Sequence, residues 1–438
     1  MAIPVTAEPT GFPRPRAVAL IVLVILALYA FEAHYRRQEK STPAALGDQS
    51  AYLGYARHLY ETNYTVTEDR NRMPVYPFLL SLIYRPGMTE DEFLARAQSF
   101  TVNLSILLLL AVFFVFRRFL PPLPAIALLA ATAFGIFIYR AGKAQAELLY
   151  YFVSFCAFVL LLQMFVKPRW WLALLAGVTI GAAHLTKASI LPALIIWAVV
   201  FAAQSFWSFR ADPWRRLGML ALVLAGFLVI VFPYIRTSKR IYDSYFYNVN
   251  STFVMWCDSS TEAYEFLKAH GDKDQWREVP AEERPSFQKY WREHSVRQIA
   301  ARILGGGREL AKKNIRAIGY YKFVLALVAF GLVLSVQRRR EARSVFARNP
   351  FAAIFCLLFL AGYFLLYAWY DTIINDSRFV LSIFLPFIFA ASIFVLRVGR
   401  DQMLSFAGRQ IPFEQLFAGV ILGLAAIDLF YNAAAAVF

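Results

Sequence analysis

Charged side chains stand at the ends of long apolar runs in this 438-residue sequence. Asp48 follows the first run, Glu147 opens a later one, and Asp376 and Arg378 precede another. A carboxylate can take a proton from a hydroxyl group, and an arginine can bind phosphate through its planar fork of donors. Ionisable groups at membrane depth usually face a cavity or a site. The pattern therefore predicts one polar site where several helices end.

Some of these residues also have a purely structural explanation. Asp48 precedes an amphipathic segment, and Asp is a favoured N-cap residue. Arg72 could contact lipid headgroups, and Lys143 could extend its ammonium group toward water. These explanations leave the acids of the same short loops unaccounted for, so the shared site stays the preferred interpretation.

Composition places the chain in a membrane. The sequence is 59% hydrophobic, with a mean hydropathy of +0.50 and a formal net charge of +16. In a soluble protein such a charge would suggest nucleic acid, but here the basic residues gather at the ends of apolar runs, and we expect no nucleic-acid partner. The three cysteines form no disulfide or zinc pattern, and we assign no metal ligands.

About eleven apolar runs are long enough to cross a hydrocarbon core of roughly 30 Å. We therefore expect an all-α polytopic membrane protein. The weakest boundary divides 171–206 into two helices at the polar stretch His184-Leu-Thr-Lys187. The expected spans are 17–33, 100–116, 121–138, 148–166, 171–186, 189–206, 217–235, 320–336, 351–370, 379–396 and 413–431.

Basic clusters follow every second span, for example Arg117 with Arg118 and Arg338 with Arg339. The positive-inside rule then puts the N-terminus inside and the C-terminus outside. Two long segments with amphipathic helices fall outside, at 34–99 and 236–318. We divide the chain into an N-terminal transmembrane module with the first outer segment, a helical outer segment, and C-terminal transmembrane helices, with bounds 1–235, 236–318 and 319–438.

Several motifs in this order resemble the GT-C superfamily of integral membrane glycosyltransferases. Asp48 follows the first span, and Arg72-Met-Pro-Val-Tyr-Pro-Phe-Leu-Leu80 comes next. Glu147 opens the fourth span, Leu-Thr-Lys187 closes the fifth, and Arg378-Phe-Val-Leu-Ser-Ile-Phe-Leu-Pro386 opens the tenth. The order of these motifs is similar to that in bacterial lipid A aminoarabinose transferases and protein O-mannosyltransferases. The resemblance covers about residues 17–390 and implies a GT-C-like fold.

The resemblance also implies an activity, in which a sugar moves from a polyprenyl phosphate to a lipid, glycan or protein acceptor. The polyprenyl phosphate would be undecaprenyl phosphate in a bacterial inner membrane, and the transfer would take place on its outer face. Asp48 would be the general base and Glu147 would support it. Gln49 stands where many relatives carry a second acid, which leaves a divalent metal open. The donor phosphate would bind Arg72, Lys187 and Arg378. Further substrate contacts would come from Tyr52, Tyr76, Arg140, Lys143, His184 and Asp376.

Two other functions are compatible with a polytopic chain. A transporter or lipid flippase would carry polar residues near the bilayer midplane, often on broken helices in paired halves. The ionisable residues here lie mainly at the predicted outer ends, which argues against it. A non-catalytic relative that only binds a lipid phosphate would keep its function after Asp48→Asn.

Overall fold

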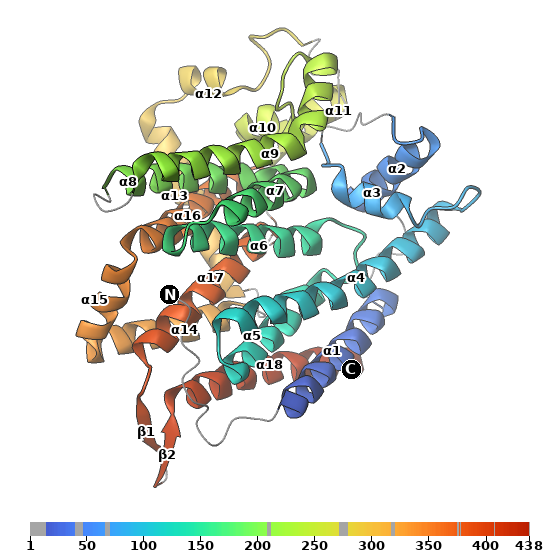
Figure 1. Cartoon of the computed structure of the whole chain (residues 1–438). Coiled ribbons are helices and arrows are strands. Elements are labelled where there is room, and N and C mark those ends of the chain that lie inside the picture. Colours follow the sequence, from blue (N-terminus) through green and yellow to red (C-terminus); the bar gives the residue numbers. More distant parts are fainter. Residues whose placement is uncertain are drawn as a thin grey trace.

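The protein is a bundle of long helices, seen in a computed structural model of the chain (Figure 1). The bundle agrees with the expected all-α class. The structure describes residues 15–39, 47–65, 71–207, 212–270, 279–316, 320–374, 376, 378–406 and 408–437.

Each predicted span is found as a helix, and the protein is a multi-pass membrane protein. Within the described ranges, nine helices are long and apolar enough to cross a membrane. They are α1 (Pro15–Glu39), α4 (Glu90–Phe119), α5 (Pro122–Gly135) continued by the short 3-10 helix η1 (Phe137–Tyr139), α6 (Glu147–Val166), α8 (Leu191–Trp207) together with the 3-10 helix η2 (Ala188–Ile190) that precedes it, α9 (Pro213–Tyr242), α16 (Pro350–Tyr370), α17 (Arg378–Val398) and α18 (Phe413–Val437).

The two remaining spans are shorter. Helices α7 (Trp170–Thr186) and α14 (Tyr321–Gln337) have 17 residues each, which is about 26 Å of helix. After α14 the chain bends by 109° into α15 (Arg339–Arg348). The predicted division of 171–206 is confirmed, because Lys187 and the short 3-10 helix η2 (Ala188–Ile190) separate α7 from α8.

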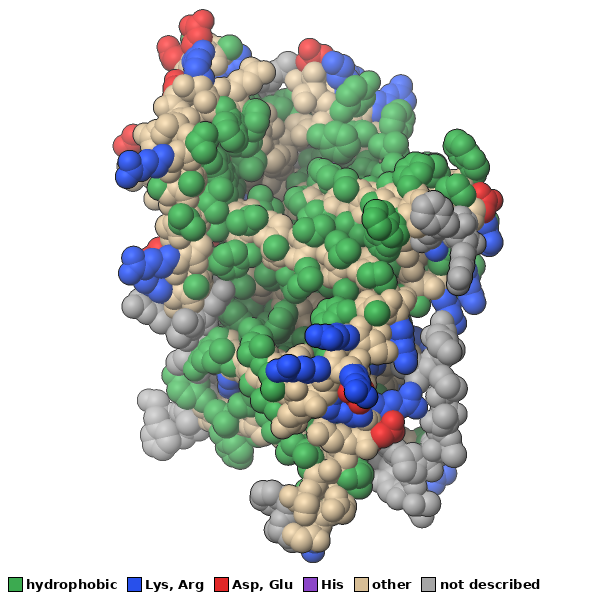
Figure 2. Space-filling view, turned by 90° about the vertical axis from the view of Figure 1, so that its left-hand side faces the viewer, with side chains coloured by type: hydrophobic (Ala, Val, Ile, Leu, Met, Phe, Trp, Pro, Cys, Tyr) green, Lys and Arg blue, Asp and Glu red, His purple; other side chains and the backbone are tan. Residues whose placement is uncertain are grey.

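Close helix crossings hold the bundle together. At the crossing of α7 and α9, a Cβ added at Gly177 would lie 2.4 Å from the Val223 carbonyl oxygen, so only glycine permits this approach. Helix α5 packs against α1, α4 and α18 and is largely buried. Figure 2 shows one side of the molecule, which is broadly covered by hydrophobic side chains. Such a surface suits contact with lipid chains.

The first predicted outer segment forms two short helices, α2 (Asp48–Glu61) and α3 (Val75–Ser81), that pack on each other and on the start of α4. Helix α4 begins with the capping box of Thr89 and Glu92, in which each side chain accepts from the other residue's backbone N–H.

The second predicted outer segment meets the C-terminal end of α16. It forms α10 (Val249–Thr252), η3 (Val254–Trp256), α11 (Ser260–His270), α12 (Phe287–Glu293) and α13 (Val296–Arg316). The Arg302 Nε donates to the Trp369 carbonyl at 3.2 Å, and the Asn250 amide bonds to Asn71 of the first segment. The two segments therefore lie at the same end of the bundle. Between α17 and α18, β1 (Met403–Phe406) pairs antiparallel with β2 (Arg409–Pro412).

Candidate active site

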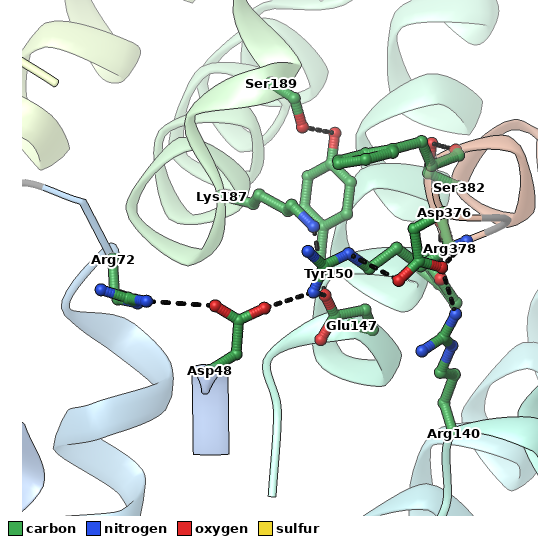
Figure 3. Close-up of polar contacts among 12 residues, drawn as sticks. Asp48, Arg72, Arg140, Glu147, Tyr150, Lys187, Ser189, Asp376, Arg378 and Ser382 are labelled. Carbon is green, nitrogen blue, oxygen red and sulfur yellow. Dashed lines mark hydrogen bonds and ion pairs between the residues drawn. The ribbon is translucent and has the colours of Figure 1, made fainter. Parts of the chain in front are cut away.

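Charged side chains from six separate stretches of the chain meet at the end of the bundle where α2 and α3 lie (Figure 3). Most of them stand at the first residue of a helix or in a short connection, because there the side chain can leave the apolar bundle without interrupting it. They are Asp48, Arg72, Arg140, Glu147, Lys187, Asp376 and Arg378.

Asp48 is held between two arginines. Arg378 Nη1 donates to its Oδ2, and Arg72 Nη2 donates to its Oδ1 at 3.1 Å. Burial opposes ionisation of this carboxyl, but Arg378 and Arg72 outweigh it and lower its pKa to about 2. Asp48 is not the N-cap, as a purely structural explanation expects. Gly47 takes that position at a φ of 57°, and no side chain caps the helix.

Glu147 lies deeper in the same cluster. Its side chain is only 3% exposed, and Lys187 Nζ lies 3.2 Å from its Oε1. Arg378 Nη1 lies 3.6 Å from the same oxygen. Glu147 is also the first residue of α6, where the helix dipole favours negative charge.

Asp376 is the third acid, and Arg140 Nη2 lies 2.7 Å from its Oδ1. Asp376 Oδ2 lies 3.3 Å from Arg378 Nε, and Asp376 Oδ1 also accepts from the Arg378 backbone N–H at 2.9 Å. Burial raises the pKa of the Asp376 carboxyl, but the charge of Arg140 more than offsets this, so the pKa is lowered. Arg378 thus contacts Asp48, Glu147 and Asp376 and is the centre of the cluster.

Lys143 is the basic residue of the site that pairs with none of its three acids. It lies in the loop that joins Arg140 to Glu147, and no ion pair or hydrogen bond connects its ammonium group to any residue that the structure describes. Burial lowers the pKa of Lys143, and repulsion from Arg140 lowers it further. With Lys143 included, five basic side chains stand against three acids at this site. The arrangement is therefore suited to an anion.

The predicted contacts Tyr52 and Tyr76 lie on α2, which Asp48 begins, and on α3. Their rings meet edge to face at 5.3 Å, and the Tyr76 hydroxyl is 2.7 Å from Thr101 Oγ1. Burial, together with the charges of Glu147 and Asp48, raises the pKa of Tyr52 well above its usual value. Tyr52 therefore lies near the acids, whereas Tyr76, on α3, is 1% exposed and packs against Tyr52 of α2 and Thr101 of α4. The substrate contacts assigned to them stay predictions.

His184 is not part of the ion-pair cluster. Its ring lies edge to face with Phe227 at 5.8 Å and with Phe246 at 5.9 Å, near the end of α7. The side chain is buried, and both of these ring contacts are with phenylalanine. Its assignment to substrate also stays a prediction.

Two further residues of the site, Gln49 and Tyr151, were given no role in the sequence analysis. Gln49 is buried, and its Oε1 accepts from the Ala144 backbone N–H at 2.9 Å, which ties α2 to the loop of Lys143. The Tyr151 hydroxyl donates to the Arg378 carbonyl at 2.7 Å. Only the contacts in the folded chain show that these two side chains support the site.

The site offers little to a metal ion. Each of the three acids is engaged by arginine or lysine, and among the residues described, no group of three or more His, Cys, Asp and Glu side chains is arranged to hold a metal.

A scan against protein-family models and a search of curated proteins gave no match. Among solved structures, the chain is similar to the oligosaccharyltransferase AglB from Archaeoglobus fulgidus, in complex with an inhibitory peptide and a dolichol-phosphate, with a TM-score of 0.51 and 16% identity. The match covers 94% of this chain and 55% of AglB, so the chain spans about half the length of that protein.

Two structures of ArnT from Cupriavidus metallidurans are also similar, one apo and one bound to undecaprenyl phosphate. Both have a TM-score of 0.39 and cover 87% of this chain and 77% of ArnT, at 16% and 15% identity. The similarity to AglB over nearly the whole chain concerns the fold. The chain therefore has a fold similar to that of AglB, in agreement with the GT-C-like fold that the sequence motifs predict.

Proposed function

We propose that the protein is a membrane glycosyltransferase that moves a sugar from a polyprenyl phosphate to an acceptor hydroxyl on a lipid, glycan or protein. The excess of basic groups at the site supports this most directly. Arg72, Arg140, Lys143, Lys187 and Arg378 face three acids, and the difference of two charges suits a phosphate group. The solved AglB structure, which has a similar fold, contains a dolichol-phosphate.

In the proposed reaction Asp48 is the general base. It accepts the proton of the acceptor hydroxyl, whose oxygen attacks the anomeric carbon of the sugar. The bond from that carbon to the phosphate oxygen breaks, and the phosphate leaves with the electron pair. Arg72, Lys187 and Arg378 stabilise the growing charge on the leaving group. Base and leaving group act on opposite faces of the sugar, so the configuration is inverted, by analogy with inverting glycosidases.

The low pKa of Asp48 fits a resting state in this reaction. Without substrate, Asp48 occupies the two arginines that would bind the donor phosphate. A phosphate competes for both guanidinium groups and adds a negative charge beside the carboxylate. Both effects raise the pKa of Asp48 from about 2, so donor binding converts a weak base into a stronger one.

We further propose that the site faces the exterior of a bacterial inner membrane, with the N-terminus inside and the C-terminus outside. The support is the alternation of basic clusters along the sequence. A reporter that is active only in the cytoplasm should be silent when fused after Phe438 and active when fused after Arg118. The reverse result would place the site on the cytoplasmic side.

Donor binding and transfer test the proposed function together. The purified protein in lipid nanodiscs should retain undecaprenyl phosphate in native mass spectrometry. It should also release this lipid from an undecaprenyl-phosphate sugar when a membrane extract supplies the acceptor. Absence of both retention and release, with uptake of a solute into proteoliposomes instead, would identify a transporter.

A further inference from the structure

The second predicted outer segment reaches the site through one amide side chain. Asn250, on α10, donates from its Nδ2 to Asn71 Oδ1 and accepts from the Tyr370 hydroxyl at 3.3 Å. We call Tyr370, Asn250 and Asn71 the Asn250 bridge. These residues come from the end of α16, from the second segment and from the first segment, so the bridge joins three parts of the chain.

The two ends of the bridge lie next to the two arginines that hold Asp48. Asn71 directly precedes Arg72 in the sequence. At the other end, the Tyr370 ring meets the ring of Phe379 at 5.7 Å, and the Arg378 guanidinium lies 5.3 Å from the Phe379 ring centroid. The bridge therefore connects the backbone beside Arg72 to the aromatic ring that supports Arg378.

Asn250 is itself firmly placed. The neighbouring Asn248 caps α10 by accepting from the Ser251 backbone N–H at 3.1 Å. Next to Asn250, Val249 is fully buried in a small apolar cluster of the second segment. That cluster also contains Ile373, in the connection that leads from α16 to Asp376 and Arg378. A rigid support of this kind can hold Arg72 and Arg378 at a fixed distance from each other.

We propose that Asn250 is a positioning residue that sets the spacing of Arg72 and Arg378, so that the second segment governs the affinity for the donor phosphate. This rests on the proposed function, in which these arginines bind that phosphate. Two arginines can bind one phosphate together only if their N–H groups point toward it, because the guanidinium group has a fixed planar geometry. A neutral amide can hold both sides without changing the charge of the site.

The test compares Asn250→Ala with Asn250→Asp in nanodiscs, with undecaprenyl phosphate as the probe. Asn250→Ala removes both hydrogen bonds and should weaken binding about tenfold, which corresponds to one typical interaction. With a sugar donor, KM should rise by a similar factor, and kcat should fall less than in Arg378→Ala, because both arginines remain at the site. Asn250→Asp keeps the acceptor for Tyr370 but loses the donor to Asn71 and adds a negative charge that repels phosphate, so it should weaken binding at least as much as Asn250→Ala.

Trp369→Phe is the matched control. Trp369 Nε1 donates to the Met255 carbonyl at 2.8 Å, so the variant loses a hydrogen bond at the same junction between the second segment and α16, one residue from Tyr370. This bond is not part of the bridge. Binding of undecaprenyl phosphate should therefore stay within twofold of the unmodified protein, even where the melting temperature falls.

Arg378→Ala, measured in the same assay, tests the proposed function separately from the role of Asn250. Loss of binding in Arg378→Ala with normal binding in both Asn250 variants would overturn the role of Asn250 and leave the proposed function standing. Normal binding in Arg378→Ala would overturn both. Equal weakening in Trp369→Phe and Asn250→Ala would show general loosening of the junction, and the specific role of Asn250 would be wrong. If Asn250→Ala does not fold, the neutral Asn250→Leu, which is close to asparagine in shape and makes neither hydrogen bond, decides in its place.

Discussion

The candidate site and the ion pair between Lys322 and Asp428 are built differently. At the candidate site, Asp48 and Asp376 keep about a third of their side chains exposed, at 31% and 32%. The second group is an ion pair between Lys322 of α14 and Asp428 of α18, where the aspartate side chain is 1% exposed. The first group is open and has more basic than acidic members, and the second is closed and balanced.

This difference distinguishes a group of charges that can bind a ligand from a pair that only stabilises the fold. A buried, balanced pair has no unmatched charge to offer a ligand, and its main effect is to hold two helices in register. An open group with extra positive charge can exchange an internal partner for an external anion. Arg378 shows this most clearly, because it contacts three acids at once. The predictions below, in order of decreasing effect, test whether the two groups divide in this way.

Asp48→Asn should have the largest effect on activity. The variant keeps the size of the side chain and loses the basic carboxylate, so transfer should fall by about 10²–10⁴-fold. Binding of undecaprenyl phosphate should not weaken, since Arg72 and Arg378 lose a competing partner. Transfer and binding are measured on the same nanodisc preparation. Near-normal transfer would remove the role of Asp48 as the base.

Arg378→Ala should weaken both binding and transfer. Hydrogen bonds to charged groups contribute about 1.5–3 kcal/mol, so a loss of about 10–100-fold in affinity is expected. Arg378→Lys should restore only part of this, because lysine keeps the charge and lacks the fork. Calorimetric or mass-spectrometric titration with undecaprenyl phosphate measures the effect. Full rescue by lysine would mean that charge alone matters at this position.

Lys322→Met should affect stability and leave chemistry intact. It leaves Asp428 buried without its partner, a change that typically costs about 3–5 kcal/mol. The double variant Lys322→Leu with Asp428→Leu should recover most of the melting temperature, since a closed pair can be replaced by apolar side chains. Transfer per folded molecule should match the unmodified protein in both. A specific loss of transfer in the folded double variant would contradict the structural role of this pair.

The pH dependence of stability should be the smallest effect. Folding lowers the pKa of Asp48 from 3.8 to about 2, so its pairing stabilises the fold above about pH 4. This contribution is lost as the pH falls from about 4 through about 2. The melting temperatures of the unmodified protein and of Asp48→Asn should therefore differ by a constant amount above pH 4, and the difference should shrink below pH 4. Convergence above pH 6 would contradict the low pKa.

Much of the fold could be predicted because membrane insertion leaves its pattern in the sequence. Each predicted span became a helix, including the division at Lys187, because an apolar run in lipid must satisfy its backbone hydrogen bonds within itself. The 109° bend after α14 and the hairpin of β1 and β2 were not expected. Both lie in short connections between spans, where hydropathy carries no information.

At the site, the sequence determined which residue types were available and at which helix ends they stand. Asp48, Glu147 and Arg378 were recognisable because charge beside an apolar run is costly without a role. The tertiary structure decided how they pair: Arg378 with three acids, Lys143 with none of the described acids, and Asn250 with residues far away in the chain. Pairing depends on distances between segments that are hundreds of residues apart, and helix packing sets those distances.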